Sequence, residues 1–556
     1  MVVLAAACSY TGPAGSDDAD EALLGGRVTS SAGEALAGIP IRAHRESSNI
    51  TVSVYTNSQG EYSFPGWSDL SAGSHSVAIE LADFEPVRRE GIMLSAGQTE
   101  RLDFSLQTRE PSVMDVTATD IVMALPGTEE QKFMLIQCDN CHSMQWVLKD
   151  PHTREEWLAI VRRMFGESRG SRNTPGTRAV RQKQYIEPLT DYLTSIRGPG
   201  SSDQIPFQLR PRPTHDAVAR LVVTEYDIPR GGIWEPYIMR GDRRFAWPHD
   251  IIMDENYAYY TDHYTDILGR LDKKTGEVKE FPLSAPPEME REENIAPGQI
   301  NATPTREPRR GTHDILFDPQ GRVVFGRRDL SIRFDPSTEQ FTYWPSGGGM
   351  FGLDPEGNVW HVIDEGSLFK VDTTTGEIKE YKIPPVDGIY DHEVDSQARS
   401  IINVWGNGML RVFDPRTEEY TDYPTPSPQS GPRRGDMDSQ DRQWLGLYWA
   451  GRLAVFDPNQ GEIREFPVIP GTEPFGAPFP MPYSAAVDEK NQIVWTSDFN
   501  SSRIYHFDMN TEEITEFFMP HPYEVRDLTV DKFADRPTLW IPDYRPPSKM
   551  VKVQLR

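Results

Sequence analysis

Cysteine is scarce in this chain, with three copies among 556 residues. Cys138 and Cys141 stand close together, but no second pair completes the four-ligand set of a structural zinc site. Long apolar runs are also lacking, since no stretch of the sequence approaches the roughly 20 residues that a transmembrane helix needs. The sequence therefore argues against a zinc-stabilised fold and against a membrane-spanning helix.

Positive charge is in short supply as well. The chain has 57 Lys and Arg residues against 84 Asp and Glu residues, which gives a formal charge of −27. Nucleic acids and anionic membranes attract cationic surfaces, so this charge argues against either as a general partner. A chain of this length should hold about two to four domains.

The first 22 residues combine a short apolar stretch with a polar tether. In MVVLAAACSYTGPAGSDDAD, the apolar part ends in small residues and Cys8. This resembles the end of a bacterial lipoprotein signal, which implies a lipid on Cys8 as the one link to a membrane. The alternative is an N-terminal extension without a processing role, carrying an unpaired cysteine.

Residues 23–108 alternate apolar and polar residues between turn signals, as in ITVSVYTNSQGEYSFPG and HSVAIELADFEPV. This period-two alternation predicts a small antiparallel β-sandwich. The pattern GxVxxxxGxxLxGxxIxA, followed by TxxxGxYxFxG, resembles the carboxypeptidase regulatory-like domain. The resemblance implies a spacer or binding accessory, and we assign this segment no chemistry.

Residues 109–200 change to helical spacing. The segments EEQKFMLIQC, REEWLAIVRRMF and QKQYIEPLTDYLTSIRG predict three helices around the motif QCDNCHSM. There, Cys138, Cys141 and His142 have the spacing that attaches c-type haem through two thioether bonds and an iron–imidazole bond. A thioredoxin-type thiol pair is the weaker alternative, because it expects a βαβ context.

This arrangement resembles a monohaem class I cytochrome c. The resemblance implies one covalent haem c, with His142 as one axial iron ligand and a methionine as the other. Met164 is our candidate because it lies between the haem motif and the final helix, whereas Met144 lies too close to His142 to reach the opposite face. Such ligation suits electron transfer. The competing interpretation of Met164 is a core residue that fills space between helices.

Basic residues gather beside the haem motif. Between residues 161 and 183 a single acid, Glu167, stands among Arg162, Arg163, Arg169, Arg172, Arg178, Arg181 and Lys183. The simplest interpretation is a solvated face. The sharper hypothesis is a docking patch that steers an acidic redox partner, or the acidic C-terminal part of this chain, toward the haem edge.

After a linker over residues 201–218, the chain repeats from residue 219 to 556. A strand ending in an aromatic residue, mostly just before proline, recurs as VVTEYDIP, GEVKEFPL, EQFTYWP, GEIKEYKIP, EEYTDYP, GEIREFPVIP and EEITEFFMP. The first of these strands has no unit before it, and the last unit ends before its own. The first strand should therefore complete the last blade of a closed seven-bladed β-propeller.

Units such as GLDPEGNVWHV and SLFKVDTTTGEIKEYKIP resemble the virginiamycin B lyase (streptogramin lyase) propeller family over residues 219–556. Together the patterns predict a multidomain, mainly β protein, in which a β-sandwich is followed by a helical cytochrome c domain and a seven-bladed propeller. We expect the tryptophans of second strands to lie in cores between blades, including Trp360, Trp495 and Trp540.

The innermost strands align on a closing aspartate as HDIIMD, HDILFD, GMFGLD, YDHEVD, RRGDMD, YSAAVD and RDLTVD. Their first two positions should ring one mouth of the central channel, where a polar small molecule and a divalent cation, Mg²⁺ or Ca²⁺, could bind. The alternative is polar lining that only ties blades together. The candidate catalytic residues are His249, Asp250, His313 and Asp314, with Asp262, His263 and His392 as further candidates.

The lyase resemblance implies lactone opening by elimination, with a histidine base, a second histidine, a glutamate and magnesium at this mouth. This chain departs from that pattern in FGRRD, where Arg327 stands in place of the wanted carboxylate.

Three functions remain open from the sequence. The leading one is a c-type haem protein that transfers electrons while its propeller binds a substrate or partner protein. It would act in the periplasm or on the outer cell surface, since haem c is attached outside the cytoplasm. The alternatives are a metal-dependent lyase or hydrolase acting at the mouth, and a non-catalytic binding or sensor protein.

Overall fold

The computed structural model describes residues 23–140, 143–164, 177–232, 242–283, 311–327, 330–346, 348–363, 366–472 and 480–556. Several residues that the sequence singles out lie outside this described part, namely Cys8, Cys141, His142, Glu167, Arg169 and Arg172.

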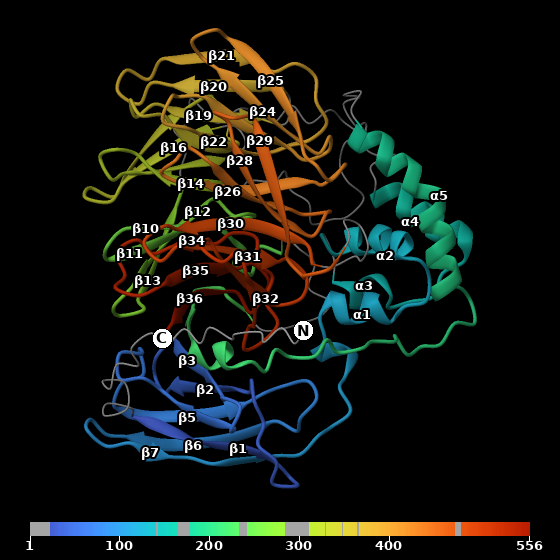
Figure 1. The fold of residues 1–556 in the computed structure, drawn as a ribbon, viewed down its shortest axis with the longest axis vertical. Helices are drawn as coiled ribbons and strands as arrows, with labels where there is room; N and C mark the ends of the chain where they lie inside the picture. Colours follow the sequence, from blue (N-terminus) through green and yellow to red (C-terminus); the bar gives the residue numbers. More distant parts are fainter. Residues whose placement is uncertain are drawn as a thin grey trace, which may run out of the picture.

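The N-terminal β-sandwich lies at one end of the molecule (Figure 1). Its strands are β1 Leu24–Ser30, β2 Pro40–Arg45, β3 Ile50–Tyr55, β4 Glu61–Ser63, β5 Gly73–Ile79, β6 Val87–Leu94, β7 Glu100–Arg101 and β8 Phe104–Leu106. One sheet has the order β4-β1-β7 with β8 also on β1, and the other runs β3-β2-β5-β6. The sandwich is as predicted except that β7 and β8 run parallel to β1. The chain returns to β1 from the other sheet rather than through a hairpin, which permits parallel pairing.

The helical part lies beside the propeller (Figure 1). It contains η1 Val113–Asp115, α1 Ala118–Ala124, α2 Glu129–Ile136, η2 Gln137–Asn140, α3 Met144–Val147, α4 Arg154–Met164 and α5 Thr177–Arg197. A further short helix, η3 Asp216–Arg220, directly precedes β9 and contacts β3 and β33. Capping boxes start α1 at Thr117 and α2 at Thr128. The three expected helices are present as α2, α4 and α5. Among the described residues, no helix is long and apolar enough to cross a membrane.

The described C-terminal part forms seven four-stranded blades arranged around one axis. The first three blades are β10 Pro248–Met253, β11 Tyr257–Asp262, β12 Ile267–Asp272 and β13 Val278–Pro282; β14 Thr312–Phe317, β15 Val323–Arg327, β16 Leu330–Asp335 and β17 Gln340–Trp344; and β18 Met350–Leu353, β19 Val359–Ile363, β20 Ser367–Val371 and β21 Ile378–Lys382. The next three are β22 Ile389–Val394, β23 Ser400–Val404, β24 Met409–Asp414 and β25 Glu419–Pro424; β26 Pro432–Met437, β27 Gln443–Leu447, β28 Arg452–Asp457 and β29 Glu462–Pro467; and β30 Pro482–Asp488, β31 Ile493–Asp498, β32 Arg503–Asp508 and β33 Ile514–Phe518. The seventh consists of β34 Thr529–Val530, β35 Thr538–Asp543 and β36 Lys549–Leu555 together with β9 Leu221–Asp227.

The ring closes as the repeat phase predicts. Strand β9, the first of the propeller in sequence, pairs antiparallel with β36, the last. Each inner strand also contacts the inner strand of the next blade, from β10 round to β34, and β10 contacts β35 of the last blade. Closure of this kind leaves no incomplete blade in the ring, and the remaining sheet edges are the short outer strands of the blades.

The aspartate that closes each inner strand has a structural role. The carboxylates of Asp318, Asp354 and Asp438 each accept the backbone N–H of the residue two positions later, which fixes the turn into the second strand. In two of these blades the second carboxylate oxygen accepts the indole N–H of Trp360 or Trp444. The repeated aspartate of the sequence is thus a turn and core residue.

The second-strand tryptophans form cores between blades, as expected. Trp360, Trp495 and Trp540 are all 0% exposed. Trp360 stacks on Tyr381 of its own blade and also contacts Phe413 of the next blade. These indoles stabilise the ring and are not ligand platforms.

The sandwich joins the propeller edge to edge. Strand β3 pairs antiparallel with β9, so the sheet β3-β2-β5-β6 continues the last blade into a single eight-stranded sheet. The side chain of Arg42 from β2 reaches the buried carboxylate of Glu225 in β9, at 3.2 Å. The outer edge of the seventh blade is therefore covered by the sandwich.

Candidate functional site

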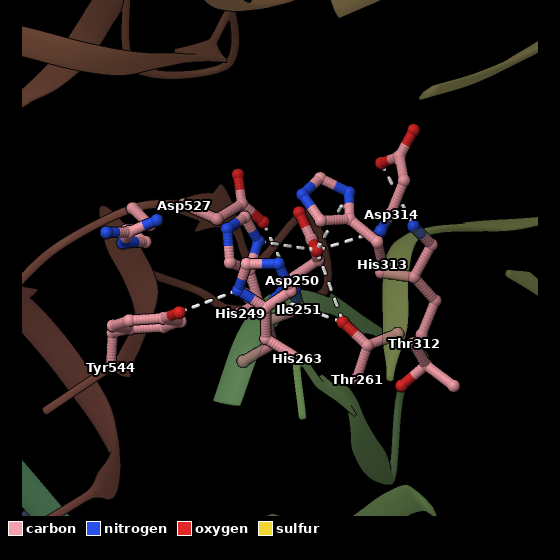
Figure 2. Close-up of polar contacts among 12 residues, drawn as sticks. His249, Asp250, Ile251, Thr261, His263, Thr312, His313, Asp314, Asp527 and Tyr544 are labelled. Carbon is pink, nitrogen blue, oxygen red and sulfur yellow. Dashed lines mark hydrogen bonds and ion pairs between the residues drawn. The ribbon is translucent and has the colours of Figure 1, made fainter. Parts of the chain in front are cut away.

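Three histidines meet at one mouth of the propeller (Figure 2). His249 comes from β10 and His313 from β14, while His263 follows the end of β11. The ring centroid of His249 lies 4.2 Å from that of His313 and 4.5 Å from that of His263. One ring nitrogen from each histidine lies within 4.8 Å of the others, a grouping that could hold a metal ion. His249 and His313, which hold the first aligned position of two inner strands, are thus brought together as the sequence predicts.

Hydrogen bonds orient this histidine cluster, defined as His249, His263 and His313. The Nδ1 of His249 lies 2.8 Å from Asp250 Oδ2, and the Nδ1 of His263 lies 2.6 Å from the Tyr544 hydroxyl. The Nδ1 of His313 is 3.9 Å from the same Asp250 oxygen. Asp250 therefore lies behind two of the three imidazoles.

Burial and charge set the protonation of the cluster. Burial lowers the pKa of His249 to about 4, although Asp250 favours its protonation. Burial and the neighbouring His249 lower the pKa of His313 well below its usual range. Burial opposes ionisation of Asp250, but the Arg434 guanidinium holds the pKa of that carboxyl well below its usual range. At neutral pH, neutral imidazoles therefore lie beside an anionic aspartate.

The aspartates at the second aligned position of the inner strands connect neighbouring blades by hydrogen bonds. Asp250 accepts the backbone N–H of Asp314 at 2.8 Å, and Asp314 in turn accepts the N–H of Phe351. Asp391 accepts from Gly435 in the next blade, at 2.8 Å. The inter-blade hydrogen bonding left open by the sequence is thus present at these aspartates, and a catalytic role for Asp250 or Asp314 stays a prediction.

Arginines and aromatic rings fill the other side of the mouth. The guanidinium carbon of Arg433 lies 4.1 Å from the ring centroid of Tyr390 and 4.7 Å from that of Tyr483. That of Arg526 lies 4.1 Å from the ring of Tyr544. Burial favours a neutral phenol, but Arg526 and Arg433 lower the pKa of Tyr483. Both arginines are buried, and this cationic and aromatic lining has the chemistry that suits an anionic or polar ligand.

The helical part covers this side of the mouth. Its helices share one hydrophobic core with Tyr448, Met481, Tyr483 and Phe499 of the propeller. The Thr119 hydroxyl donates to the carbonyl of Asn500 at 3.0 Å. The rings of Phe133 in α2 and Trp449 pack edge to face at 6.3 Å. The segment that carries the Cys-x-x-Cys-His motif is therefore packed against the propeller.

A continuous series of contacts links that motif to the histidine cluster. Arg545 Nη2 lies 3.7 Å from Asp139, inside the motif, and 2.8 Å from Glu524. Glu524 also pairs with Arg526 at 3.0 Å. Arg526 lies over the ring of Tyr544, whose hydroxyl meets His263.

The structure separates the methionines of the helical part. Met164, the last residue of α4, is 48% exposed, whereas Met144 is fully buried in the shared core. The interpretation of Met164 as a core residue is therefore wrong. Cys138 is half-buried in η2 and packs against that core.

Other predicted residues lie elsewhere or are otherwise engaged. Asp262 pairs with Arg230 at 3.0 Å, and Arg327 lies 3.5 Å from Asp266. His392 is fully buried beside Gly352 and does not join the histidine cluster. Arg162 pairs with Glu187 at 3.5 Å, so part of the basic stretch is neutralised.

Sequence reasoning missed Tyr544 and Arg434. Tyr544 follows the end of β35, as His263 follows β11 and Phe499 follows β31. Aligning the ends of the second strands would have placed Tyr544 in one column with His263. Arg434 holds the second position of the aligned strand RRGDMD but was not named as a candidate site residue, although it pairs with Asp250.

Comparisons with known proteins agree with the sandwich, and several solved structures resemble part of the chain. The profile of the carboxypeptidase regulatory-like domain matches residues 24–107. No curated protein matches the chain. A streptogramin B lyase structure is 18% identical over 61% of this chain and 99% of its own, with a TM-score of 0.48. Virginiamycin B lyase from Staphylococcus aureus is 16% identical over 56% of this chain and 96% of its own, with a TM-score of 0.45.

A further similar structure is the extracellular domain of a protein described as a one-component system from B. thetaiotaomicron. It is 14% identical, covers 55% of this chain and 40% of its own, and has a TM-score of 0.39. The assignment of a seven-bladed ring rests on the strand pairings themselves.

Proposed function

We propose that the protein is a c-type haem protein of the periplasm or outer cell surface, whose helical part exchanges electrons while the propeller mouth binds a polar substrate or a partner protein. The observation that carries the proposal is the single hydrophobic core shared by the helices around Cys138 and the mouth residues Tyr448 and Tyr483. If the helices only separated the sandwich from the propeller, they would not need to share a hydrophobic core with the mouth.

The described residues are compatible with haem c. Cys138 lies at the end of a capped helix, and the thioether of Met164 is accessible at the end of α4. Haem held there would carry one electron at a time. The protein's own contribution is to position this motif against the mouth, through Asp139, Arg545 and the shared core.

The contacts between the motif and the mouth give the proposal a physical route. Electron exchange requires the donor and acceptor to lie close together, and the series Asp139, Arg545, Glu524, Arg526 and Tyr544 connects the two by direct contact. A substrate or partner bound on the arginine and tyrosine side would lie against the same helices.

The first test is the visible absorption spectrum of the protein produced in a host with c-type haem maturation. We expect a c-type spectrum that survives denaturation and is lost in the Cys138→Ser, Cys141→Ser double variant. Met164→Leu should change the spectrum of the oxidised protein, because it would remove the thioether that we propose as the second iron ligand. The matched control is Met123→Leu, which removes another exposed methionine of the helical part, 37% exposed in α1.

A wild-type protein without visible absorption would contradict the haem proposal. An equal spectral change in the Met164 and Met123 variants would overturn the ligand assignment while leaving the haem in place.

A lyase or hydrolase acting at the mouth is the second candidate, and the neutral, buried imidazole of His249 beside His263 and His313 favours it. Arg327 in place of a carboxylate weighs against the magnesium-dependent form. Lactone or ester turnover that needs a divalent metal and persists in the double cysteine variant would support this candidate. Turnover that disappears together with the haem would count against it.

A further inference from the structure

The histidine cluster contains a buried nitrogen with no protein partner. His249 is 0% exposed, and its Nδ1 is held by Asp250. Its Nε2 has no hydrogen-bond partner among the described residues. Leaving a buried ring nitrogen unsatisfied costs about 1–3 kcal/mol, so its persistence calls for a ligand. The nearest chemistry-bearing groups are the imidazoles of His263 and His313.

We propose that His249, His263 and His313 bind one imidazole-preferring transition-metal ion, zinc or copper, at the propeller mouth. This site differs in chemistry from the Mg²⁺ or Ca²⁺ expected from the sequence. It does not depend on the haem, because all three histidines belong to the propeller.

The donor set decides the class of metal. Imidazole suits zinc, copper, iron and nickel, whereas Mg²⁺ and Ca²⁺ take carboxylate, carbonyl and water oxygens. The carboxylates at hand are already engaged. Asp250 pairs with Arg434, Asp262 pairs with Arg230, and Asp314 accepts the backbone N–H of Phe351. No uncommitted carboxylate among these three is left to hold a hard cation.

The outer contacts resemble those of metal-binding histidines. A ligating histidine usually gives its second ring nitrogen to a carboxylate or another polar group, which fixes the ring. Here Asp250 holds the Nδ1 of His249 and the Tyr544 hydroxyl holds that of His263. His313 is more loosely fixed, at 3.4 Å from Arg434.

The spacing requires only a small adjustment. Tetrahedral Zn–N bonds of about 2.0–2.1 Å place ligand nitrogens about 3.3 Å apart. The nitrogens here lie within 4.8 Å of one another. Small rotations of the rings, above all of the loosely held His313, would close that difference.

The test loads the full-length, chelator-stripped protein with Zn²⁺ or Cu²⁺ in an excess of Mg²⁺ and Ca²⁺. After gel filtration, elemental mass spectrometry gives zinc or copper and iron per chain. We expect one retained zinc or copper, lost in His263→Gln and in His313→Gln. The Cu²⁺ form should show nitrogen hyperfine coupling in electron paramagnetic resonance. Tyr544→Phe keeps the ring but removes the hydroxyl, and should weaken metal affinity about 10–100-fold.

The matched control is His215→Gln, which removes an exposed imidazole that contacts Glu516 and Phe517 on the outer part of a blade. It should retain the metal in full. No retained metal in the wild type, or equal retention in the His263→Gln and His215→Gln variants, would overturn the site. Circular dichroism of each variant separates loss of the metal from loss of the fold. The iron content of the same samples reports on the haem separately.

Discussion

His361 is a buried imidazole without a function in the site. It lies in β19 at 0% exposure, stacked on Phe369 at 5.0 Å, and neither ring nitrogen has a hydrogen-bond partner among the described residues. Burial lowers the pKa of His361 from 6.5 to about 3. A histidine whose pKa falls on folding contributes its full stability above its unfolded pKa, and that stability is lost as the pH falls toward the folded pKa.

We predict that His361→Phe makes the fold less sensitive to acid. Below pH 6.5 the wild type should lose up to about 1.4 kcal/mol of unfolding free energy per pH unit through this residue, because the unfolded chain takes up a proton that the folded chain refuses. Phenylalanine keeps the aromatic packing and takes up no proton. Denaturant unfolding between pH 7 and pH 5 would measure the difference in slope.

The control for this experiment is His215→Phe, at an exposed position. The prediction requires His361→Phe to change the pH slope more than this control does. If His361→Phe showed the wild-type slope, another group would have to account for any acid sensitivity.

Two residues of the site were predictable because the repeat could be aligned, and His263 was predictable because it follows the next strand of the same blade. His249 and His313 stood in one column of the inner strands, and the structure brings their rings to 4.2 Å. Tyr544 lies after a second strand, in a column that the alignment on inner strands does not include. Arg434 was in the alignment, but its pairing with Asp250 joins the fifth blade to the first across the channel, which no pattern within one blade can indicate.

At the scale of elements, strand β9 joins the last blade to the sandwich by pairing on both of its edges. It completes the last blade through β36 and carries the sandwich through β3. Its Glu225 is 0% exposed, and lies between Arg42 of the sandwich and His521 and Lys549 of the propeller. The junction between the two domains is thus a buried ionic cluster on one strand.

We predict that Glu225→Gln strongly destabilises this junction. Removing one partner of a buried ion pair leaves the other charge uncompensated, at a cost of about 3–5 kcal/mol. The control is Glu80→Gln, which removes the other carboxylate on the same Arg42, at 2.9 Å but with a side chain 43% exposed. Exposed pairs contribute at most about 1 kcal/mol. Guanidinium unfolding midpoints should therefore separate the two variants, and equal shifts would contradict the buried role of Glu225.

The closure by β9 could be predicted, whereas the docking of the sandwich could not. Closure follows from the phase of a repeat, because the first strand lacked a unit and the last unit lacked a strand. Edge-to-edge pairing of β3 with β9 uses backbone groups that every residue carries, so it leaves no pattern in either segment. For the same reason the parallel pairing of β7 and β8 with β1 was missed.

At the scale of the whole molecule, the helical part and the propeller behave as one unit around the mouth. Arg545, which follows Tyr544 directly, lies between Asp139 of the Cys-x-x-Cys-His motif and Glu524. The sequence predicted each part by its own periodicity. It could not predict that the helices cover the mouth, because packing between domains depends on surfaces that fold separately.

If haem is bound as proposed, this packing should be measurable in its midpoint potential. A nearby positive charge favours the reduced haem, which carries one more electron, so we predict that Arg545→Gln lowers the potential by on the order of 20–60 mV. The control is Arg464→Gln in β29, which removes the same charge at an outer strand where it pairs with Glu512 at 2.7 Å. Potentiometric titration of both variants decides between a local contact and a change of net charge. A cation held against the motif should shift the potential more than a cation on an outer strand. Equal shifts in the two variants, or a higher potential in Arg545→Gln, would therefore show that Arg545 does not act on the haem.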